Sequence, residues 1–560
     1  MEYNVRLCGA AGQGLQSVGK VLISALSKTG WHIYAHQDYE SRIRGGANFF
    51  QIRISDRPLT TFSPQVDLLV ALSSESYQIF ADDLHPQSIC FHPGPEKLNR
   101  DFTEHIFNPE TVAQESGGNK RMASAVVAGL VWATVSEDHE PVLAELAEFF
   151  GARDQEIGEG NRKAGAAGVE LARQLGIKAL AGGPRPEAGR MVLRGNDAVA
   201  LGALAAGVKY VAAYPMTPST SITELIAAEG KKLGVSVEQA EDEIAAINMA
   251  IGAGYTGVRA MTTTSGGGFC LMTEAIGLAG SAEIPVVVVN GQRPGPSTGL
   301  PTRTEQGDLL FAVHSGHGDF PVAVLAPGSI EEAFYIMGDA FNFAEQYQIP
   351  VIVLTDQYLA DSFQTLSELA PDRIKIDRGK LAEPSENYKR YQLTSDGISP
   401  RLFPGAEPAV VVSAGDEHNE EGHLIEDAET RIAMMEKRMN KLKQISVLQP
   451  VTCGETKQPT LSLITWGSTW GIVQEAVQDL VSSGVSVQGI HLPQLAPLPA
   501  EALQAILSAG PVYTVESNFS GQLATLLKGH GFTISGTCSR YDGRPLEVRQ
   551  IIEYVREVQG

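Results

Sequence analysis

The chain has 560 residues, a formal net charge of −22 and 43% hydrophobic residues. An acidic balance of this size excludes nucleic acid or an anionic membrane surface as the main partner. At about 150 residues per domain, the length predicts three or so globular domains.

Five cysteines are scattered along the chain without a Cys-x-x-Cys pair. This spacing leaves no sequence-readable zinc or iron–sulfur site and indicates a reducing compartment. The chain begins without a basic-then-apolar leader, and no apolar run approaches the roughly 20 residues of a membrane span. We therefore expect a cytoplasmic protein whose own residues bind no metal.

The N-terminal residues predict a strand, a Gly-rich turn and a helix. Alternating apolar residues from Tyr3 onward enter the turn Gly9–Gly14, and apolar residues at helical spacing follow from Leu15. Such a turn brings backbone amides to an anion at a helix N-terminus, although a plain tight connection is the commoner reading. We expect no acidic residue to end a second strand, because Asp38 and Glu40 are placed in a polar loop.

Composition divides the chain into α/β domains and linkers. Strands at 48–54 and 66–72 continue the first domain, and the Gly/Pro-rich stretch 181–186 is a linker. The predicted fold class is α/β with several domains. We place a first α/β domain, a central domain, a linker with an amphipathic helix, and a last α/β domain at residues 1–180, 190–375, 376–455 and 456–560, respectively.

The stretch 211–305 has the clearest pattern of a functional site. Apolar runs end abruptly in the small or polar residues of Tyr214–Ser219, Thr262–Gly268 and Val286–Arg293. Parallel strands have this pattern where their carboxyl ends carry a site. We expect a helix at 201–207 to lead into the first of these strands.

Two prolines surround Thr217 in the first of these segments. Pro215 and Pro218 fix the backbone and hold Thr217 in an extended, rigid turn. A hydroxyl fixed in such a turn can donate to a carboxylate. An ordinary turn at the end of a strand explains the segment equally well.

Glu243 is the carboxylate expected to face the core. At helical spacing it shares a face with Ile247 and Ala250, whereas Glu241 points the opposite way. A buried carboxylate needs a partner or a raised pKa. An acidic first turn that complements the helix dipole explains Glu241 and Asp242 well, but it explains Glu243 poorly.

These segments resemble a known family. A glutamate before an Ala-rich helix, with a Thr-Ser-Gly-Gly turn after it, is similar to the pyrimidine-binding domain of thiamine-diphosphate enzymes. The Tyr-Pro-Met-Thr-Pro segment and Arg293 narrow the resemblance to the α subunit, with a fused γ domain, of a 2-oxoacid:ferredoxin oxidoreductase. The resemblance covers nearly the whole chain, although the γ domain usually has glycine where Ala11 stands.

The resemblance implies roles for residues of the central stretch. In the family, the glutamate at the position of Glu243 hydrogen-bonds the aminopyrimidine and promotes the tautomer that deprotonates the thiazolium carbon. Glu243 is therefore the expected catalytic residue. The expected cofactor-binding residues are Pro215, Glu243, Thr264, Ser265 and Gly266, and the expected substrate-binding residues are Tyr214, Thr217, Arg293 and Arg303.

Arg293 and Thr217 are expected to hold the 1-carboxylate of the substrate. A guanidinium fork and a fixed hydroxyl match a carboxylate geometrically. A structural arginine paired with a nearby acid is the alternative for Arg293. Arg303 is the candidate for a second carboxylate, which makes 2-oxoglutarate the first choice and leaves pyruvate and branched-chain 2-oxoacids open.

Motifs missing from the chain predict a partner. No Gly-Asp-Gly occurs, so the usual oxygen ligands for Mg²⁺ at a diphosphate site are missing. No cysteine cluster can hold an iron–sulfur cluster either. In the resembling family, a β subunit carries the diphosphate site, the Mg²⁺ and the iron–sulfur cluster. We expect thiamine diphosphate to bind at the interface with this subunit, in an (αβ)2 assembly.

The resemblance also implies the reaction. The expected activity is the reversible, CoA-dependent oxidative decarboxylation of 2-oxoglutarate to succinyl-CoA and CO2, with ferredoxin as electron acceptor; the reverse direction fixes CO2. The loop Tyr39–Gly46, with its two arginines, also resembles a segment of the γ domain, and this domain as a whole is expected to cover the active site and handle coenzyme A. The alternatives are an oxidoreductase for another 2-oxoacid, a self-contained thiamine enzyme, and a non-catalytic nucleotide- or acyl-CoA-binding protein.

The C-terminal third offers weaker signals. The acidic and histidine residues at 416–423 could be metal ligands, but a solvated acidic turn is the favoured reading. Apolar spacing at Ile432, Met435, Met439 and Leu442 predicts an amphipathic helix with these residues on its buried face. The last domain resembles the transketolase C-terminal domain. Four of its residues match the family without an assigned role, namely Glu516, Asn518, Gly521 and Gln522.

Overall fold

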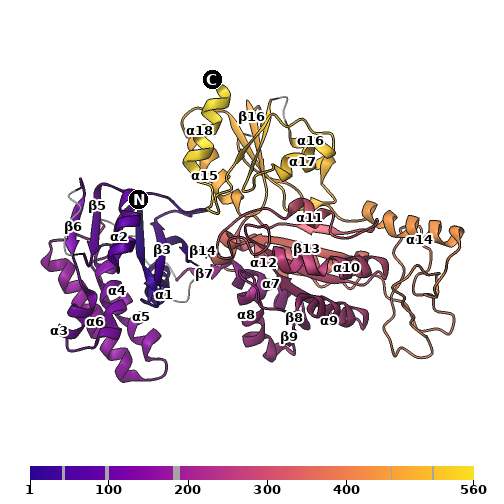
Figure 1. The fold of residues 1–560 in the computed structure, drawn as a ribbon, viewed down its shortest axis with the longest axis horizontal. Helices are drawn as coiled ribbons and strands as arrows, with labels where there is room; N and C mark the ends of the chain where they lie inside the picture. Colours follow the sequence, from indigo (N-terminus) through magenta and orange to yellow (C-terminus); the bar gives the residue numbers. More distant parts are fainter. Residues whose placement is uncertain (41–44, 95–99, 181–188, 456, 508–509) are drawn as a thin grey trace. The chain divides into compact units, whose positions relative to one another are not determined.

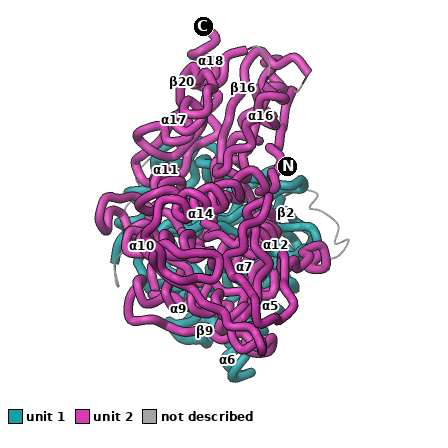
Figure 2. The backbone as a smooth tube through the Cα atoms, turned by 90° about the vertical axis from the view of Figure 1, so that its right-hand side faces the viewer, with its two compact units in different colours: residues 1–194, 362–369 teal, residues 195–361, 370–560 magenta. Residues whose placement is uncertain are grey.

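The computed structural model describes residues 1–40, 45–94, 100–180, 189–455, 457–507 and 510–560. They form two compact units, which Figure 2 colours separately: unit 1 is residues 1–194 with 362–369, and unit 2 is residues 195–361 with 370–560. The predicted linker at 181–186 and the two loop arginines, Arg42 and Arg44, lie outside the described residues.

Unit 1 is built on a mixed sheet that has eight strands in the described part of the chain (Figure 1). In spatial order they are β6 (Thr103–Ile106), β5 (Leu84–His92), β4 (Val66–Ala71), β1 (Glu2–Ala11), β3 (Gly45–Ser55), β2 (His32–Asp38), β14 (Phe363–Leu366) and β7 (Met191–Arg194). Its helices are α1 (Leu15–Lys28), α2 (Ser74–Phe80), α3 (Pro109–Glu115), α4 (Ala123–Ala133), α5 (Glu140–Gly151) and α6 (Gln155–Gln174). Because side chains alternate along β1, Leu7 joins the core beneath α1 and α4, and Cys8 joins the core beneath α2.

The predicted strand, turn and helix at the N-terminus are confirmed. Gly12 and Gly14, with φ of 91° and 80°, make the turn in a left-handed conformation that favours glycine. The expectation that Asp38 lies in a loop is wrong. Residues 32–38 pair with β3 along their whole length, so β2 ends at Asp38.

The central part of unit 2 is a sheet of seven strands within the described residues. In spatial order they are β18 (Gln494–Ala496), β12 (Ala323–Leu325), β13 (Pro350–Asp356), β11 (Val286–Gln292), β10 (Ala260–Thr264), β8 (Tyr210–Ala213) and β9 (Ser236–Gln239). The helices are α7 (Gly195–Ala205), α8 (Thr220–Gly230), α9 (Glu243–Tyr255), α10 (Gly266–Ser281), α11 (Leu309–Val313), α12 (Ile330–Tyr347) and α13 (Gln357–Asp361). The helix expected at 201–207 is α7, which begins earlier, at Gly195. Gly195 packs against the Leu359 backbone, where any side chain would clash.

The C-terminal domain contributes a second sheet to unit 2. Its described strands, in spatial order, are β15 (Val451–Gly454), β17 (Val487–His491), β16 (Leu461–Thr465), β19 (Val512–Glu516) and β20 (Gly536–Ser539). The helices are α15 (Thr469–Ser482), α16 (Ala500–Ile506), α17 (Gln522–Gly529) and α18 (Val548–Gln559). Trp466 and Leu523 of this domain share one hydrophobic core with Phe269 and Leu309 of the central part. The α/β class predicted from the sequence is confirmed.

Residues 376–441, here called the strap, are irregular until they reach α14 (Ala428–Asn440) beside the C-terminal end of α10 (Figure 1). The predicted buried face of α14 is wrong. Ile432 is 58% exposed, whereas Met434, Lys437 and Arg438 are buried. Charged side chains occupy the buried face because Lys437 pairs with Glu283 and Arg438 pairs with Glu417.

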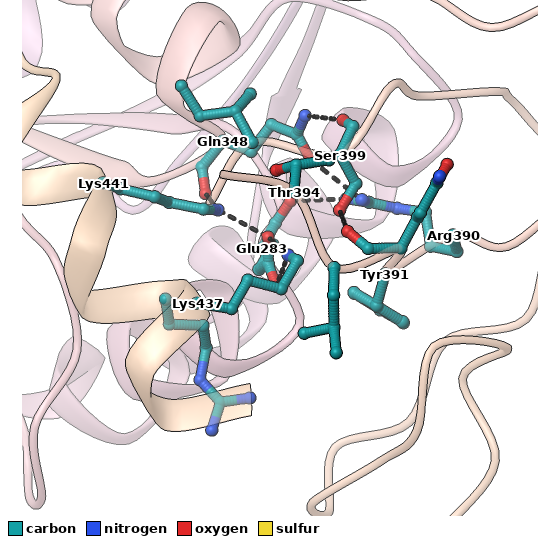
Figure 3. A network of polar contacts seen from close by, with 12 residues as sticks. Glu283, Gln348, Arg390, Tyr391, Thr394, Ser399, Lys437 and Lys441 are labelled. Carbon is teal, nitrogen blue, oxygen red and sulfur yellow. Dashed lines mark hydrogen bonds and ion pairs between the residues drawn. The ribbon is translucent and has the colours of Figure 1, made fainter. Parts of the chain in front are cut away.

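Glu283 is the centre of the network that holds the strap to the central part of unit 2 (Figure 3). Its two carboxylate oxygens lie 2.6 and 2.7 Å from the Lys437 ammonium, and Lys441 lies 2.5 Å away. The Arg390 guanidinium donates to the Glu283 carbonyl at 2.7 Å. Burial alone would raise the pKa of the Glu283 carboxyl, but these cations hold the pKa below its usual value.

Two of the acidic and histidine residues at 416–423 make contacts within the strap. His418 is fully buried, with its ring centroid 3.9 Å from that of Tyr391, and Glu417 pairs with Arg438. The favoured reading of a solvated turn is therefore wrong for His418. Among the residues that the structure describes, no cluster of three or more His, Cys, Asp or Glu side chains is placed to hold a metal ion.

Candidate functional site

Polar residues meet at the carboxyl ends of the parallel strands β8, β10, β11 and β13. In the register of the sheet, Thr264 lies opposite Asn290, and Gln292 lies opposite Asp356. Tyr214 follows the end of β8 directly. This edge is where open α/β sheets place their ligands.

Glu243 begins α9 and points into the core, as the sequence predicts. The side chain of the preceding residue, Asp242, caps the helix by accepting from the Ala245 N–H at 2.7 Å. Glu243 is only 4% exposed, and Ile247 and Ala250 on the same face are fully buried. Its Oε1 atom is buried without a hydrogen-bond partner among the described residues. A buried carboxylate oxygen in this state is costly unless a ligand satisfies it.

Gly268 in the first turn of α10 makes room for Glu243. A Cβ atom there would lie 2.5 Å from Glu243 Oε1 and 2.3 Å from Thr264 Oγ1, so only glycine fits. The hydroxyl of Ser265, the N-cap residue of α10, is also buried without a partner in the described part of the chain. The structure thus brings together Glu243, Thr264 and Ser265, while Gly266 begins the helix beside them.

Arg293 also contacts Thr217, through the backbone carbonyl of Thr217 rather than its hydroxyl. The Arg293 guanidinium donates to the Thr217 carbonyl at 2.9 Å, and burial lowers the pKa of Arg293. Pro218 packs over Gly291 at the end of β11, and the buried Asn196 amide donates to the Pro218 carbonyl at 2.7 Å. Asn196 belongs to α7 and Pro218 to the turn after β8, so no local pattern in the sequence indicates this contact.

Tyr214 and Pro215, which begin the same turn, are exposed, Tyr214 to 39%. They lie on the surface of unit 2 next to the buried site residues. Their predicted contacts with substrate and cofactor stay predictions.

Two carboxyl groups that the sequence did not assign lie on the loop after β11. Asp308 packs against Gly266, where a Cβ atom would lie 2.7 Å from its Oδ2, and it accepts from the Asn290 amide at 3.0 Å. Burial raises the pKa of Asp308. Burial and the neighbouring Asp308 charge raise the pKa of Glu305 to about 7. In the sequence, Gly307-Asp308 is followed by leucine and so lacks the second glycine of a Gly-Asp-Gly motif.

Arg303 lies on this loop but contacts a different region from Arg293. It packs against Gly543 of the C-terminal domain, where a Cβ atom would lie 3.1 Å from Arg303 Cβ. Burial and the charge of Arg544 lower the pKa of Arg303 to about 10. Two guanidinium groups therefore gather at this end of the loop.

Unit 1 contains a separate hollow of about 400 Å³ at its Gly-rich turn. The turn and the start of α1 form one side, the end of β2 with Asp38 forms another, and residues 48–50 complete the lining. The turn leads directly into the N-terminus of α1, and the backbone amides of a helix N-terminus favour the binding of anions.

Comparison with known proteins identifies the family. A family model described as pyruvate flavodoxin/ferredoxin oxidoreductase, thiamine diP-bdg, matches residues 201–437, and one described as pyruvate ferredoxin/flavodoxin oxidoreductase matches residues 4–171. The chain is 33% identical to the 2-oxoacid:ferredoxin oxidoreductase subunit alpha of a Sulfolobus species, over 96% of this chain and 94% of that protein.

The chain belongs to the α subunits of the 2-oxoacid:ferredoxin oxidoreductases.

Two further relatives are similar over nearly their whole length. The 2-oxoglutarate oxidoreductase subunit KorA of Mycobacterium tuberculosis is 29% identical over 94% of this chain and 86% of that protein. A solved structure of the 2-oxoglutarate:ferredoxin oxidoreductase from Magnetococcus marinus, with 2-oxoglutarate, coenzyme A and succinyl-CoA bound, is 32% identical, with a TM-score of 0.93 and coverage of 99% of both chains.

The buried polar atoms at this edge fit a thiamine diphosphate ligand, which a matched family model names. The matched model names a thiamine-diphosphate-binding region that includes α9 and β10. Three polar atoms are buried at this edge without a hydrogen-bond partner among the described residues: Glu243 Oε1, the Ser265 hydroxyl oxygen and Asn290 Oδ1. An α subunit implies partner subunits. None of the described helices is both long enough and apolar enough to span a membrane.

Proposed function

We propose that this α subunit converts 2-oxoglutarate and coenzyme A reversibly to succinyl-CoA and CO2, with ferredoxin as electron acceptor. Thiamine diphosphate binds between this chain and a β subunit that supplies Mg²⁺ and an iron–sulfur cluster, in an (αβ)2 assembly. The Magnetococcus marinus enzyme and the mycobacterial KorA protein, both named for 2-oxoglutarate, support this substrate. The absence of Gly-Asp-Gly from the sequence supports the shared site.

The observation that carries the proposal is the Oε1 of Glu243, which is buried beside Gly268 and has no hydrogen-bond partner in the described part of the chain. A carboxyl group in this position can hold a proton against a ring nitrogen of a bound aminopyrimidine, and the hydroxyl of Ser265 can donate to the same ring. When bound, thiamine diphosphate supplies the carbanion chemistry at the 2-oxo carbon, and the protein supplies orientation and electrostatics. Pro215, Thr264 and Gly266 complete the proposed cofactor-binding set.

Substrate recognition is assigned to the two arginines of the loop, with Tyr214 and Thr217 beside Arg293. Arg293, whose fork is oriented by the Thr217 carbonyl, binds the 1-carboxylate. Arg303 binds the second carboxylate, which pyruvate lacks. Coenzyme A is assigned to unit 1, where the hollow at the Gly-rich turn offers backbone amides to its phosphates.

The proposal is tested by co-expression of the chain with the β subunit of its host, followed by assay of bound thiamine diphosphate and iron. We expect CoA-dependent reduction of a viologen dye by 2-oxoglutarate. Reduction by pyruvate instead would keep the mechanism and change the substrate. A chain that binds acyl-CoA but no partner and no thiamine diphosphate would contradict the proposal.

Variants of the two arginines distinguish 2-oxoglutarate from pyruvate as the substrate. The variant Arg303→Gln should raise KM for 2-oxoglutarate by roughly tenfold or more and leave KM for pyruvate unchanged, because it removes one charge-assisted contact. The matched variant Arg293→Lys, which keeps the charge but loses the fork, should raise KM for both substrates. Equal effects of Arg303→Gln on both substrates would contradict the assignment of Arg303.

A further inference from the structure

Four residues of the C-terminal domain match the family without a role, and the structure places all four around the loop that carries Arg303, Glu305 and Asp308. The four residues, here called the C-terminal clamp, are Glu516, Asn518, Gly521 and Gln522. Of these, Glu516 and Asn518 are almost completely buried.

Asn518 of the clamp and its neighbours in the C-terminal domain hold Gln306, the fully buried centre of the loop, from several directions. Asn518 donates its amide to the Gln306 carbonyl at 3.1 Å. The backbone of Ser517 exchanges two hydrogen bonds with Gln306, at 2.6 Å to the N–H and 2.9 Å to the side-chain oxygen. The Gln306 amide also donates to the Trp466 carbonyl at 2.7 Å. Contacts in several directions fix both the position and the rotation of this part of the loop.

Gln522, the first residue of α17, hydrogen-bonds the loop on both sides of Asp308. Its amide donates to the Gly307 carbonyl at 2.6 Å, and its oxygen accepts from the Leu310 N–H at 3.0 Å. Leu310 belongs to α11, which begins directly after Asp308. The same side chain therefore sets the spacing between the loop and the helix on either side of Asp308.

The clamp is itself rigid. The Glu516 carboxylate accepts from the Asn518 amide at 2.8 Å and from the Leu523 and Ala524 N–H groups at 2.8 and 3.2 Å. The Asn518 oxygen accepts from the Gly521 N–H at 2.9 Å. Because Glu516 fixes Asn518 and the start of α17 together, the amides that reach the loop are oriented in advance.

We propose that Asn518 and Gln522 are positioning residues of the substrate site, which act by holding Gln306 and Gly307 in register with the strand edge. The proposal rests on the assignment of Arg303 to the substrate made above. The held residues lie between Arg303 on one side and Asp308, against Gly266, on the other. A shift of the loop would therefore move Arg303, which is assigned to the second carboxylate of the substrate, and Asp308 at the same time.

Hydrogen bonds are suited to this task in a way that apolar contacts are not. The shared core of the two parts of unit 2 already keeps them together through apolar burial, which is not directional. Amide groups that both donate and accept define one register of the loop. A small displacement of the loop lengthens the hydrogen bonds between Arg303 and a substrate carboxylate, which weakens substrate binding.

The test compares Gln522→Ala and Asn518→Ala with a matched control, in the complex with the β subunit. The control is Thr514→Val, because Thr514 is buried in β19 and its hydroxyl bonds the hydroxyl of Thr537 in β20 at 2.8 Å. We expect both clamp variants to raise KM for 2-oxoglutarate by roughly tenfold, with kcat at saturation changed by less than about threefold. Thr514→Val should lower thermal stability comparably and leave KM unchanged.

The near-isosteric Gln522→Met keeps the volume of the side chain and serves if the alanine variants do not fold. Its expected result is the same rise in KM, with faster amide hydrogen exchange in a peptide that covers residues 300–312. An unchanged KM in a folded clamp variant would overturn the proposal and make the clamp a stability feature alone. Failure of the proposed function is distinguishable, since the wild-type complex would then not turn over 2-oxoglutarate at all.

Discussion

Two glutamates of unit 2 are buried to nearly the same degree, and their surroundings differ completely. Glu283 is fully buried and meets the ammonium groups of Lys437 and Lys441 (Figure 3). Glu243 is 4% exposed, and its Oε1 has no partner among the described residues. Burial by itself therefore does not separate a structural acid from a functional one.

The difference lies in which groups satisfy the charge. A structural carboxylate has its partners within the chain, and the loss of one partner leaves an uncompensated buried charge. A buried carboxylate that has no partner in the surrounding protein and lies near the ends of parallel strands is the pattern expected of active sites, where a ligand supplies the partner. The predictions below test this distinction.

The largest effect is expected for Glu243→Gln. Removal of the ionisable group at this position should lower CoA-dependent turnover by roughly 10²–10⁴-fold, the range for a lost general acid–base group. The free energy of unfolding should not fall, because the amide replaces a carboxylate whose buried Oε1 has no partner among the described residues. Turnover is measured by dye reduction and stability by urea denaturation. Near-normal turnover would remove Glu243 from the catalytic role.

Glu283→Gln should have the opposite effects: it should lower stability and leave activity unchanged. It leaves Lys437 and Lys441 buried without a counter-charge, which costs about 3–5 kcal/mol of unfolding free energy. The activity of each folded complex should be retained. The control Glu229→Gln removes an exposed ion pair with Lys232 and should cost well under 1 kcal/mol. A loss of activity without a loss of stability in Glu283→Gln would contradict the structural role of Glu283.

A smaller effect, with a defined pH dependence, is expected for Lys441→Met. Burial lowers the pKa of Lys441 to about 7 in spite of Glu283. Between this pKa and the ordinary lysine value near 10.5, the unfolded chain binds more protons than the folded chain, so stability rises with pH. Relative to Lys441→Met, the wild type should gain up to about 1.4 kcal/mol per pH unit from pH 7 to 9. Parallel curves for the two proteins would contradict the lowered pKa.

Local patterns were sufficient for the elements that organise the site. The spacing of Glu243, Ile247 and Ala250 predicts the buried face of α9, and the structure confirms it. The Gly-rich turn after β1 and the run of valines in β11 likewise identify their elements, because periodicity and turn chemistry are local properties of the sequence. The roles of the predicted site residues stay predictions.

Features that depend on distant partners could not be read from the sequence. Apolar spacing predicts that Ile432 is buried in α14, but the helix turns Lys437 inward, toward a glutamate 154 positions away. The hold of Asn518 on Gln306 spans 212 positions. Charge pairs and amide contacts of this kind follow from tertiary packing, which local periodicity does not encode.

The return of the chain to unit 1 at β14 has a consequence for any attempt to divide the protein. This strand lies between β2 and β7 and hydrogen-bonds both, although it follows β13 in the chain. A fragment that stops at Arg194 lacks it, so β2 becomes an open edge strand with unpaired backbone groups, and β7 loses its neighbour in the sheet. Open edges of this kind recruit other chains and aggregate. A soluble N-terminal fragment therefore requires residues 362–369 to be grafted onto it or supplied as a separate peptide.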